Sequence, residues 1–207
     1  MLHPDTEVRF INKNIGHGVF ATRLIPRGTA VWVMDRFDRV FREEEVRALE
    51  PVYQEILEKY CFRDRQGRWV FCWDNTRFIN HSFHPTCITT PYGFEIAVRD
   101  ILSGQEITND YGFFNIIEPF DCLPEPGCPR TRVFPDDILR FAPEWDRQLA
   151  PAFAAFALVE QPLAGLIKPE FLDTLARIAR GEVQPASIRT CYFDPAAAGQ
   201  TDGQTHA

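Results

Sequence analysis

Three short stretches of this sequence combine residue types that could do chemistry. The first is Asn-His-Ser at residues 80–82, set between the apolar pair Phe78-Ile79 and Phe83. Buried polar groups must find partners, so such a triplet either forms a turn or holds a ligand. A turn is the simpler interpretation of the triplet alone, because Asn and Ser bond readily to their own backbone.

The other two stretches are Gly-His-Gly at residues 16–18 and Asn-Asp-Tyr-Gly at residues 109–112. The glycines could form a tight turn with positive φ, or they could let a ligand approach the backbone closely. The third stretch could be a strand end whose Tyr111 hydroxyl is hydrogen-bonded, as is usual for a core tyrosine. Each stretch alone is therefore open to a purely structural interpretation.

Short strands and one helical insert must position these residues. Helical spacing of apolar residues predicts helix within 42–60, with Pro51 dividing it in two. The strands do not alternate with long helices, which argues against a parallel α/β sheet and favours a β-rich α+β fold. Strands are predicted at Val8–Ile11, Val19–Ala21, Ala30–Val33, Trp69–Trp73, Cys87–Thr90, Phe94–Val98 and Ile107–Thr108.

Two segments of the chain echo each other. Residues 21–31 and 97–107 share the pattern A-x-R-x-I-x-x-G-x-x-[VI]. Each reads as a strand, a polar turn closed by Gly28 or Gly104, and a second strand. We therefore expect two similar hairpins in one β-rich body.

The composition changes after about residue 119. A Pro-rich loop precedes helices, the clearest of which starts near Pro169 and stops at Gly181, with an apolar face that must pack on the β-rich body. The small, polar residues from 194 onward predict a disordered tail. The expected organisation is thus a domain over 5–118, a loop and helical extension over 119–193, and a tail over 194–207.

The bulk composition narrows the classes of function. The chain has 207 residues, a formal charge of −7 and a pI near 5.3, which argues against direct nucleic-acid binding. An acidic surface suits a basic protein or peptide partner, although it also simply favours solubility. Neither a signal peptide nor a clean membrane span is visible, and six dispersed cysteines fit a reduced, cytoplasmic protein. The oligomeric state is not indicated.

Taken together and in order, the motifs resemble one family. G-x-G-V-F-A, R-x-I-P-x-G-T, R-F-I-N-H-S-x-x-P-T-C and R-D-I-x-x-G-x-E-I-T-x-D-Y-G resemble the SET domain of protein lysine methyltransferases, over roughly residues 7–114. The resemblance implies small curved β-sheets with a knot-like crossing of the N-H-S and D-Y-G segments, followed here by C-terminal helices. It also implies transfer of a methyl group from S-adenosylmethionine to a lysine side chain of a protein substrate.

The resemblance further implies roles for individual residues. Tyr111 would be the catalytic tyrosine, and Asn109, Phe113 and Phe114 would lie along the lysine channel. The chemistry needs mainly placement of a neutral amine for in-line attack, and burial beside a positive sulfonium disfavours the charged amine. The cofactor-binding residues would be Gly16, His17, Gly18, Tyr60, Asn80, His81 and Tyr111.

Two departures from the family pattern matter. Many SET domains bind zinc through cysteines, but this chain has Phe83 at the first such position and keeps only Cys122 and Cys128 in the later segment. A closed site wants four ligands, and the alternative set His81, His84 and Cys87 would use a pocket residue, so no zinc is expected. The C-terminal helices would replace the zinc segment as the lid of the channel.

The second departure is Asn109, where the family often has Tyr or Phe whose size helps set the number of methyl groups added. Asparagine leaves mono-, di- and trimethylation open. The alternative function is a catalytically silent module that binds S-adenosylmethionine or a peptide. The sequence does not identify the protein substrate.

Overall fold

The computed structural model describes residues 1–195, and the structure below refers to them. The strands are β1 (Thr6–Asn12), β2 (Gly16–Ala21), β3 (Ala30–Val33), β4 (Arg39–Phe41), β5 (Cys61–Arg63), β6 (Trp69–Phe71), β7 (Asn80–His81), β8 (Cys87–Thr89), β9 (Phe94–Ala97), β10 (Glu106–Asn109), β11 (Phe120–Asp121) and β12 (Arg132–Val133). The α-helices are α1 (Glu43–Arg47), α2 (Pro51–Tyr60), α3 (Asp137–Ala155) and α4 (Pro169–Ala179). Short 3-10 helices are η1 (Asn75–Phe78), η2 (Tyr111–Phe113), η3 (Phe156–Leu158), η4 (Ala164–Leu166) and η5 (Ile188–Cys191).

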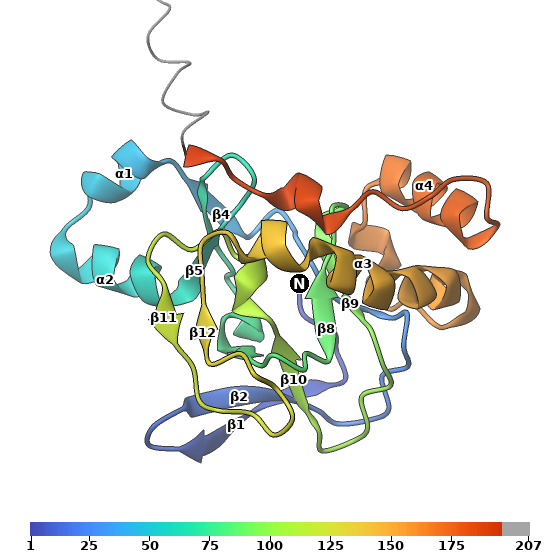
Figure 1. The fold of residues 1–207 in the computed structure, drawn as a ribbon, viewed down its shortest axis with the longest axis horizontal. Coiled ribbons are helices and arrows are strands. Elements are labelled where there is room, and N and C mark those ends of the chain that lie inside the picture. Colours follow the sequence, from blue (N-terminus) through green and yellow to red (C-terminus); the bar gives the residue numbers. More distant parts are fainter. Residues whose placement is uncertain (196–207) are drawn as a thin grey trace, which may run out of the picture.

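The strands form several small sheets, which confirms a β-rich body followed by C-terminal helices. Their orders are β1-β2-β10-β7, β3-β9-β8, β4-β6-β5 and β11-β12. In Figure 1, β1 and β2 lie at one edge of the molecule, α1 and α2 at a second, and α4 at a third. Proline opens α2 at its first position, as the division of the helical insert at Pro51 predicted.

The two echoed segments do not form hairpins, so that expectation is wrong. Instead they pair antiparallel with each other, and Ile25 and Ile101 exchange two backbone hydrogen bonds of 2.9 Å at the centre. Further along, the Gly28 amide donates to the Ala97 carbonyl at 2.8 Å. Each segment therefore leads from one sheet into another, so the ladder between β2 and β10 continues into that between β3 and β9. The similar sequences reflect mutual pairing, which a local turn pattern cannot reveal.

The C-terminal helices pack on the β3-β9-β8 sheet, as the apolar face of the predicted helix required. Helix α3 buries a stripe at helical spacing that includes Ile138, Trp145 and Phe153, and this stripe shares one core cluster with Ile88 and other residues of the sheet. In Figure 1, α3 crosses in front of β8 and β9. The extension after residue 119 thus shares its main core with the β-rich body.

Some elements escaped the sequence patterns. Strands β4 and β5 are only three residues long and pair with β6, which itself ends at Phe71 rather than Trp73. The predicted tail lies, from residue 196 onward, outside the described residues. Among the helices of residues 1–195, none is long and apolar enough to cross a membrane.

Candidate active site around Tyr111

Two of the three motifs are joined by parallel pairing between β7 and β10. Asn80 lies opposite Thr108, and His81 lies opposite Asn109. The Ser82 amide then donates to the Asn109 carbonyl at 3.0 Å. This pairing brings segments about thirty residues apart in the sequence into direct contact, so the polar triplet is fixed by a neighbouring strand rather than by a local turn.

The Gly-His-Gly stretch joins the same sheet, because β2 pairs antiparallel with β10. The Asn80 amide Nδ2 donates to the His17 carbonyl at 3.0 Å and to Glu106 Oε1 at 2.7 Å. A Cβ atom on Gly18 would lie 2.5 Å from Glu106 Oε1 and 3.0 Å from Asn80 Nδ2, so any larger residue would displace these two side chains. Gly16 has a φ of +86° and open space where its Cβ would be.

Tyr111 begins the 3-10 turn that follows β10, and it is held at both ends. Its backbone amide donates to His81 Nδ1 at 3.1 Å, and its hydroxyl donates to the Ile79 carbonyl at 2.7 Å. Burial raises the pKa of Tyr111, so the phenol is neutral at physiological pH. With its single proton committed to Ile79, the hydroxyl oxygen has lone pairs left to accept a hydrogen bond.

His81 is a neutral imidazole in this setting. Burial lowers its pKa to about 4. Because Nδ1 accepts from the Tyr111 amide, we assign the proton to Nε2, which is buried and lacks a partner among the described residues. The ring also meets Phe83 edge-on, with centroids 4.4 Å apart. An unmet donor of this kind favours a ligand whose acceptor reaches it.

A buried ion network supports the Asp-Tyr-Gly turn from below. Arg130 bridges Asp110 and Asp137, with 2.8 Å from Arg130 Nη2 to Asp137 Oδ2, and both carboxylates are fully buried. Burial raises the pKa of Asp110 and outweighs the lowering by Arg130. The guanidinium also lies over Phe83 and Phe141, at 4.3 and 4.1 Å from the ring centres. The Pro-rich loop thereby fixes the motif through Arg130, which sequence reasoning missed.

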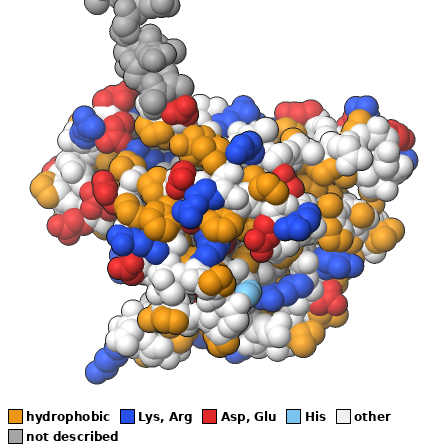
Figure 2. Space-filling model, viewed as in Figure 1, with side chains coloured by type: hydrophobic (Ala, Val, Ile, Leu, Met, Phe, Trp, Pro, Cys, Tyr) orange, Lys and Arg blue, Asp and Glu red, His pale blue; other side chains and the backbone are white. Residues whose placement is uncertain are grey.

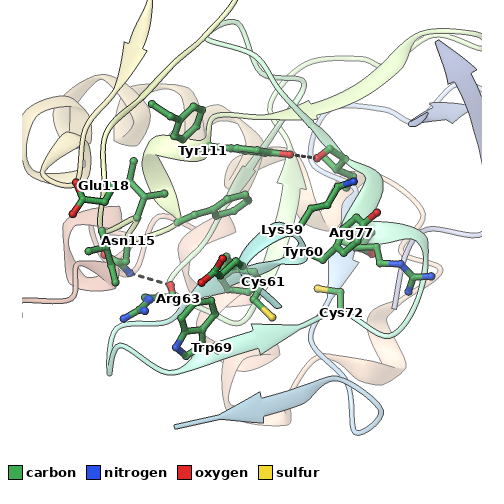
Figure 3. A pocket seen from close by; sticks show the side chains of 18 of the residues that line it. Lys59, Tyr60, Cys61, Arg63, Trp69, Cys72, Arg77, Tyr111, Asn115 and Glu118 are labelled. Atoms are coloured by element: carbon green, nitrogen blue, oxygen red, sulfur yellow. Dashed lines mark hydrogen bonds between the residues drawn. The ribbon is translucent and has the colours of Figure 1, made fainter. Parts of the chain in front are cut away.

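A cavity of about 630 Å³ opens on the other side of Tyr111. Its aromatic walls are Trp32, Tyr60, Phe62, Trp69, Tyr111, Phe114 and Phe120. Figure 3 shows Tyr111 on one side of it and Trp69 and Cys72 on the opposite side in this view. This volume and lining are typical of a small-molecule or side-chain pocket.

The predicted site residues divide between two places. Tyr60, Tyr111 and Phe114 line the cavity, whereas residues 16–18, 80 and 81 form the strand cluster next to it. Phe113 packs into the core instead, with its ring centroid 4.0 Å from that of Trp145. Asn109 is fully buried behind the cavity wall. No residue of α3 or α4 lines the cavity as the structure describes it, so these helices cover the β3-β9-β8 sheet rather than act as its lid.

One cavity residue, Glu95, was not among the sequence candidates. It sits in β9, has 4% of its surface exposed, and accepts hydrogen bonds from Asn109 Nδ2 at 2.7 Å and from Thr89 and Cys87. Burial raises its pKa to about 7. The available signal was a glutamate in the middle of the otherwise apolar strand Phe94–Ala97.

No group of three or more His, Cys, Asp and Glu residues within the described chain is arranged to hold a metal ion. Cys122 and Cys128 are both half-buried free thiols. The expectation that no zinc is bound stays a prediction.

Comparison with known proteins matches the SET domain family over residues 16–112, a span that contains all three motif stretches. A curated relative, the variant-silencing SET domain-containing protein of Plasmodium falciparum (isolate 3D7), is 30% identical over 141 residues. The alignment covers 60% of this chain but 5% of the relative, so the chain spans about one twentieth of that protein. SET domains are generally methyltransferase domains. The matched motifs, and the pairing that assembles them around Tyr111, thus identify a SET domain over residues 16–112.

Proposed function

We propose that this protein transfers a methyl group from S-adenosylmethionine to a lysine side chain of a protein substrate. The observation that carries the proposal is the pairing of β7 with β10, which sets Asn80 and His81 beside Tyr111 and next to an aromatic cavity. A methyl transfer gains most of its rate from such fixed placement of two reactants.

The strand cluster fits the cofactor. Among residues 1–195, His81 Nε2 is a buried donor without a partner, and the Gly16 backbone borders open space, so polar groups of a ligand would have positions to bind there. Residues 16–18, Asn80 and His81 would hold the molecule. When bound, S-adenosylmethionine supplies an electrophilic methyl group on a positively charged sulfur. The knot-like crossing of the two motif segments stays a prediction.

The chain's own residues would prepare the amine. The Tyr111 hydroxyl is oriented by its bond to Ile79 and can accept an N–H from the amine, holding the nitrogen lone pair in one direction. Aromatic side chains would surround the amine in the cavity, and the loss of water there disfavours an ammonium group that has no carboxylate beside it. A free lysine has a pKa of about 10.4, so this loss of a proton is a necessary step.

A basic peptide is the proposed partner. The segment 42–60, which carries α1 and α2, has six glutamates against three basic residues, a net charge of −3. It borders the cavity through Glu58, Lys59 and Tyr60. Figure 2 shows acidic side chains along the edge of the molecule where Figure 1 places α1 and α2, beside clustered hydrophobic ones. Such a surface attracts and orients a Lys/Arg-rich segment.

An intracellular, cytoplasmic location belongs to the same proposal. All six cysteines are free thiols in the structure. Free thiols persist in reducing compartments.

The test begins with binding and ends with chemistry. Calorimetric titration of S-adenosylhomocysteine should show one-to-one binding, and an array of lysine-bearing peptides with radiolabelled S-adenosylmethionine should show methyl transfer. Tyr111→Phe should reduce transfer by at least about 100-fold while cofactor binding survives. Tyr53→Phe removes an equivalent hydroxyl from the exposed face of α2 and should change neither.

The outcomes separate the two candidate functions. Cofactor binding with methyl transfer that depends on Tyr111 supports the enzyme. Cofactor binding without transfer to any peptide indicates the catalytically silent module. A folded protein that binds no S-adenosylhomocysteine contradicts both.

A further inference from the structure

Glu95 is an unusual group to find in the wall of an aromatic cavity. Its carboxylate is 4% exposed and lines the cavity together with Tyr111. The hydrogen-bond donors around it are the amide of Asn109, the hydroxyl of Thr89 and the thiol of Cys87. All three are neutral, and no Lys, Arg or His forms an ion pair with Glu95 within residues 1–195. A buried carboxylate normally needs a positive partner.

The other charged and titratable groups of the cavity do not supply that partner. Lys59, Arg63 and Arg77 line it without an ion pair to Glu95 in the described chain, and Arg63 pairs with Glu43 at 3.1 Å. Cys72, Cys87 and Tyr111 all have their pKa raised by burial and by Glu95 itself, so they remain neutral. The amino group of Met1 acts from further away and is bound to Asp35 at 2.9 Å. Burial accordingly dominates and raises the pKa of Glu95 to about 7.

A buried amide beside Glu95 has one unsatisfied acceptor. Asn109 is fully buried, and its Nδ2 donates to Glu95 and Thr89, but its Oδ1 has no partner in the described chain. Asn109 lies behind the cavity wall and orients Glu95, so the Glu95 carboxylate, which has no cation among the described residues, is the group that a ligand in the cavity can reach. An alkylammonium group has three donors, one positive charge and no acceptor. The apolar cavity wall would accommodate its alkyl chain.

We propose that Glu95 binds the alkylammonium group of the substrate in this cavity and takes one proton from it. The inference rests on the proposed lysine methylation. In this step an N–H bond breaks, its electron pair stays on nitrogen, and an O–H bond forms on Glu95. Lysine becomes a neutral amine and Glu95 a neutral acid. The proton leaves to solvent after the product departs, which restores the carboxylate.

Nuclear magnetic resonance tests the binding without any methyl transfer. In protein labelled at the glutamate side-chain carboxyl carbon, the signal missing from Glu95→Gln identifies Glu95, and a pH titration gives its pKa. Adding n-butylamine, a cation throughout the range, should lower this pKa by about one unit or more, because an opposite charge favours the carboxylate. Neutral 1-butanol should not lower it. An equal effect of both probes, or of neither, overturns the proposal.

The pH dependence of methyl transfer tests the proton step, with the best peptide of the array as substrate. Wild-type kcat/KM should fall about tenfold per pH unit below pH about 7, because Glu95 must be ionised. In Glu95→Gln, kcat/KM at pH 7.5 should be about 100-fold lower than in wild type, and its fall below pH about 7 should disappear. The variant should still bind S-adenosylhomocysteine, and its melting temperature should be unchanged or higher. Glu144→Gln removes an exposed carboxylate from α3 and should match wild type.

The two tests keep the proposals distinct. If butylamine shifts the pKa of Glu95 but no peptide is methylated, the lysine methyltransferase function fails and the amine-binding role stands. If peptides are methylated and Glu95→Gln keeps both the rate and the low-pH limb, the role of Glu95 fails and the methyltransferase stands.

Discussion

Two buried carboxylates lie on opposite sides of the Tyr111 turn, and their surroundings differ. Asp110, on the side of the strand cluster, is bound by Arg130, which also binds Asp137. Glu95, on the side of the cavity, has only neutral donors around it. Burial raises the pKa of both carboxyls, but among the described residues only Asp110 is in direct contact with a cation that opposes the rise.

The difference separates a supporting role from a binding role. A buried charge that is paired within the chain needs nothing more and can fix a turn, as Asp110 does by accepting from the Gly112 amide at 2.9 Å. A buried charge that is unpaired lowers the stability of the free protein and gains from a ligand of opposite charge. The polar groups of the strand cluster are thus mostly satisfied by contacts within the protein, and His81 Nε2 is the exception. In the cavity, by contrast, the Glu95 carboxylate has no cation paired with it among the described residues.

Removing the cation from Asp110 should have the largest effect. Arg130→Ala leaves Asp110 and Asp137 buried without a positive partner and should lower the free energy of unfolding by about 3–5 kcal/mol. Urea denaturation measures this loss. Arg132→Ala is the control, because Arg132 pairs with the exposed Asp121 at 3.5 Å, and it should cost less than about 1 kcal/mol. Equally small losses of unfolding free energy in the two variants would mean that the ion pair of Arg130 with Asp110 contributes no more than an exposed one.

Removing the charge of Glu95 should have the opposite sign and should depend on pH. The pKa of Glu95 is about 7 in the folded chain against 4.5 in its ordinary state, so the folded protein binds the proton more tightly. This bound proton therefore stabilises the folded protein fully below pH 4.5, and the stabilisation is lost as the pH rises to 7. Glu95→Gln should therefore match wild type below pH 4.5 and exceed it above pH 7 by up to roughly 3 kcal/mol.

Urea denaturation of both proteins across this range measures the difference. Wild-type stability alone would mislead, because the pKa of His81 is lowered to about 4 and its contribution rises with pH between 4 and 6.5. That contribution cancels when the two proteins are compared at one pH. A difference independent of pH would show that Glu95 is not an unpaired charge.

The sequence predicted the strand cluster well and the cavity poorly. Asn80, Gly18 and Tyr111 lie in motifs whose order along the chain indicated the family. Local patterns placed β3 and α2 correctly but found β2 only from Val19, because its first three residues have the composition of a turn that precedes a strand. Glu95 was not found, because one glutamate in a short strand looks like any solvent-facing position. Its burial depends on neighbours from β8, β10 and the end of β6, which no local pattern contains.

Long-range pairing explains the other errors as well. The echoed segments were interpreted as hairpins since a Gly turn between apolar runs has the same local signature whether the chain folds back or continues into another sheet. Phe113 and Phe114 are adjacent aromatics, and only the 3-10 turn at Tyr111 decides that the first packs against Trp145 and the second faces the cavity. Arg130 lies in a Pro-rich loop without periodicity, so its contact with Asp110 could not be inferred.

Filling the close approach at Gly18 should have an intermediate effect. The added Cβ in Gly18→Ala would lie 2.5 Å from Glu106 Oε1 and 2.8 Å from Ile11 Cδ1, so these two side chains and the Asn80 bonds must shift. We expect a loss of about 1–3 kcal/mol in unfolding free energy and a weaker affinity for S-adenosylhomocysteine. Gly165→Ala, where the new Cβ meets open space, should leave both unchanged. Unchanged binding in Gly18→Ala would place the cofactor away from the strand cluster.

The smallest expected effect concerns the bond between the Pro-rich loop and the Asn-His-Ser stretch. Glu125 accepts from the Ser82 hydroxyl and from the Phe83 amide, each at 2.9 Å. Glu125→Ala should cost about 1 kcal/mol, because the site is only half-buried and water can replace the carboxylate. Hydrogen exchange should quicken at the Phe83 amide, whereas Asp121→Ala, at the exposed end of β11, should leave that amide unchanged. Slow exchange in Glu125→Ala would mean that Arg130 alone fixes the loop, and that the support of the strand cluster is concentrated in the single ion network around Asp110.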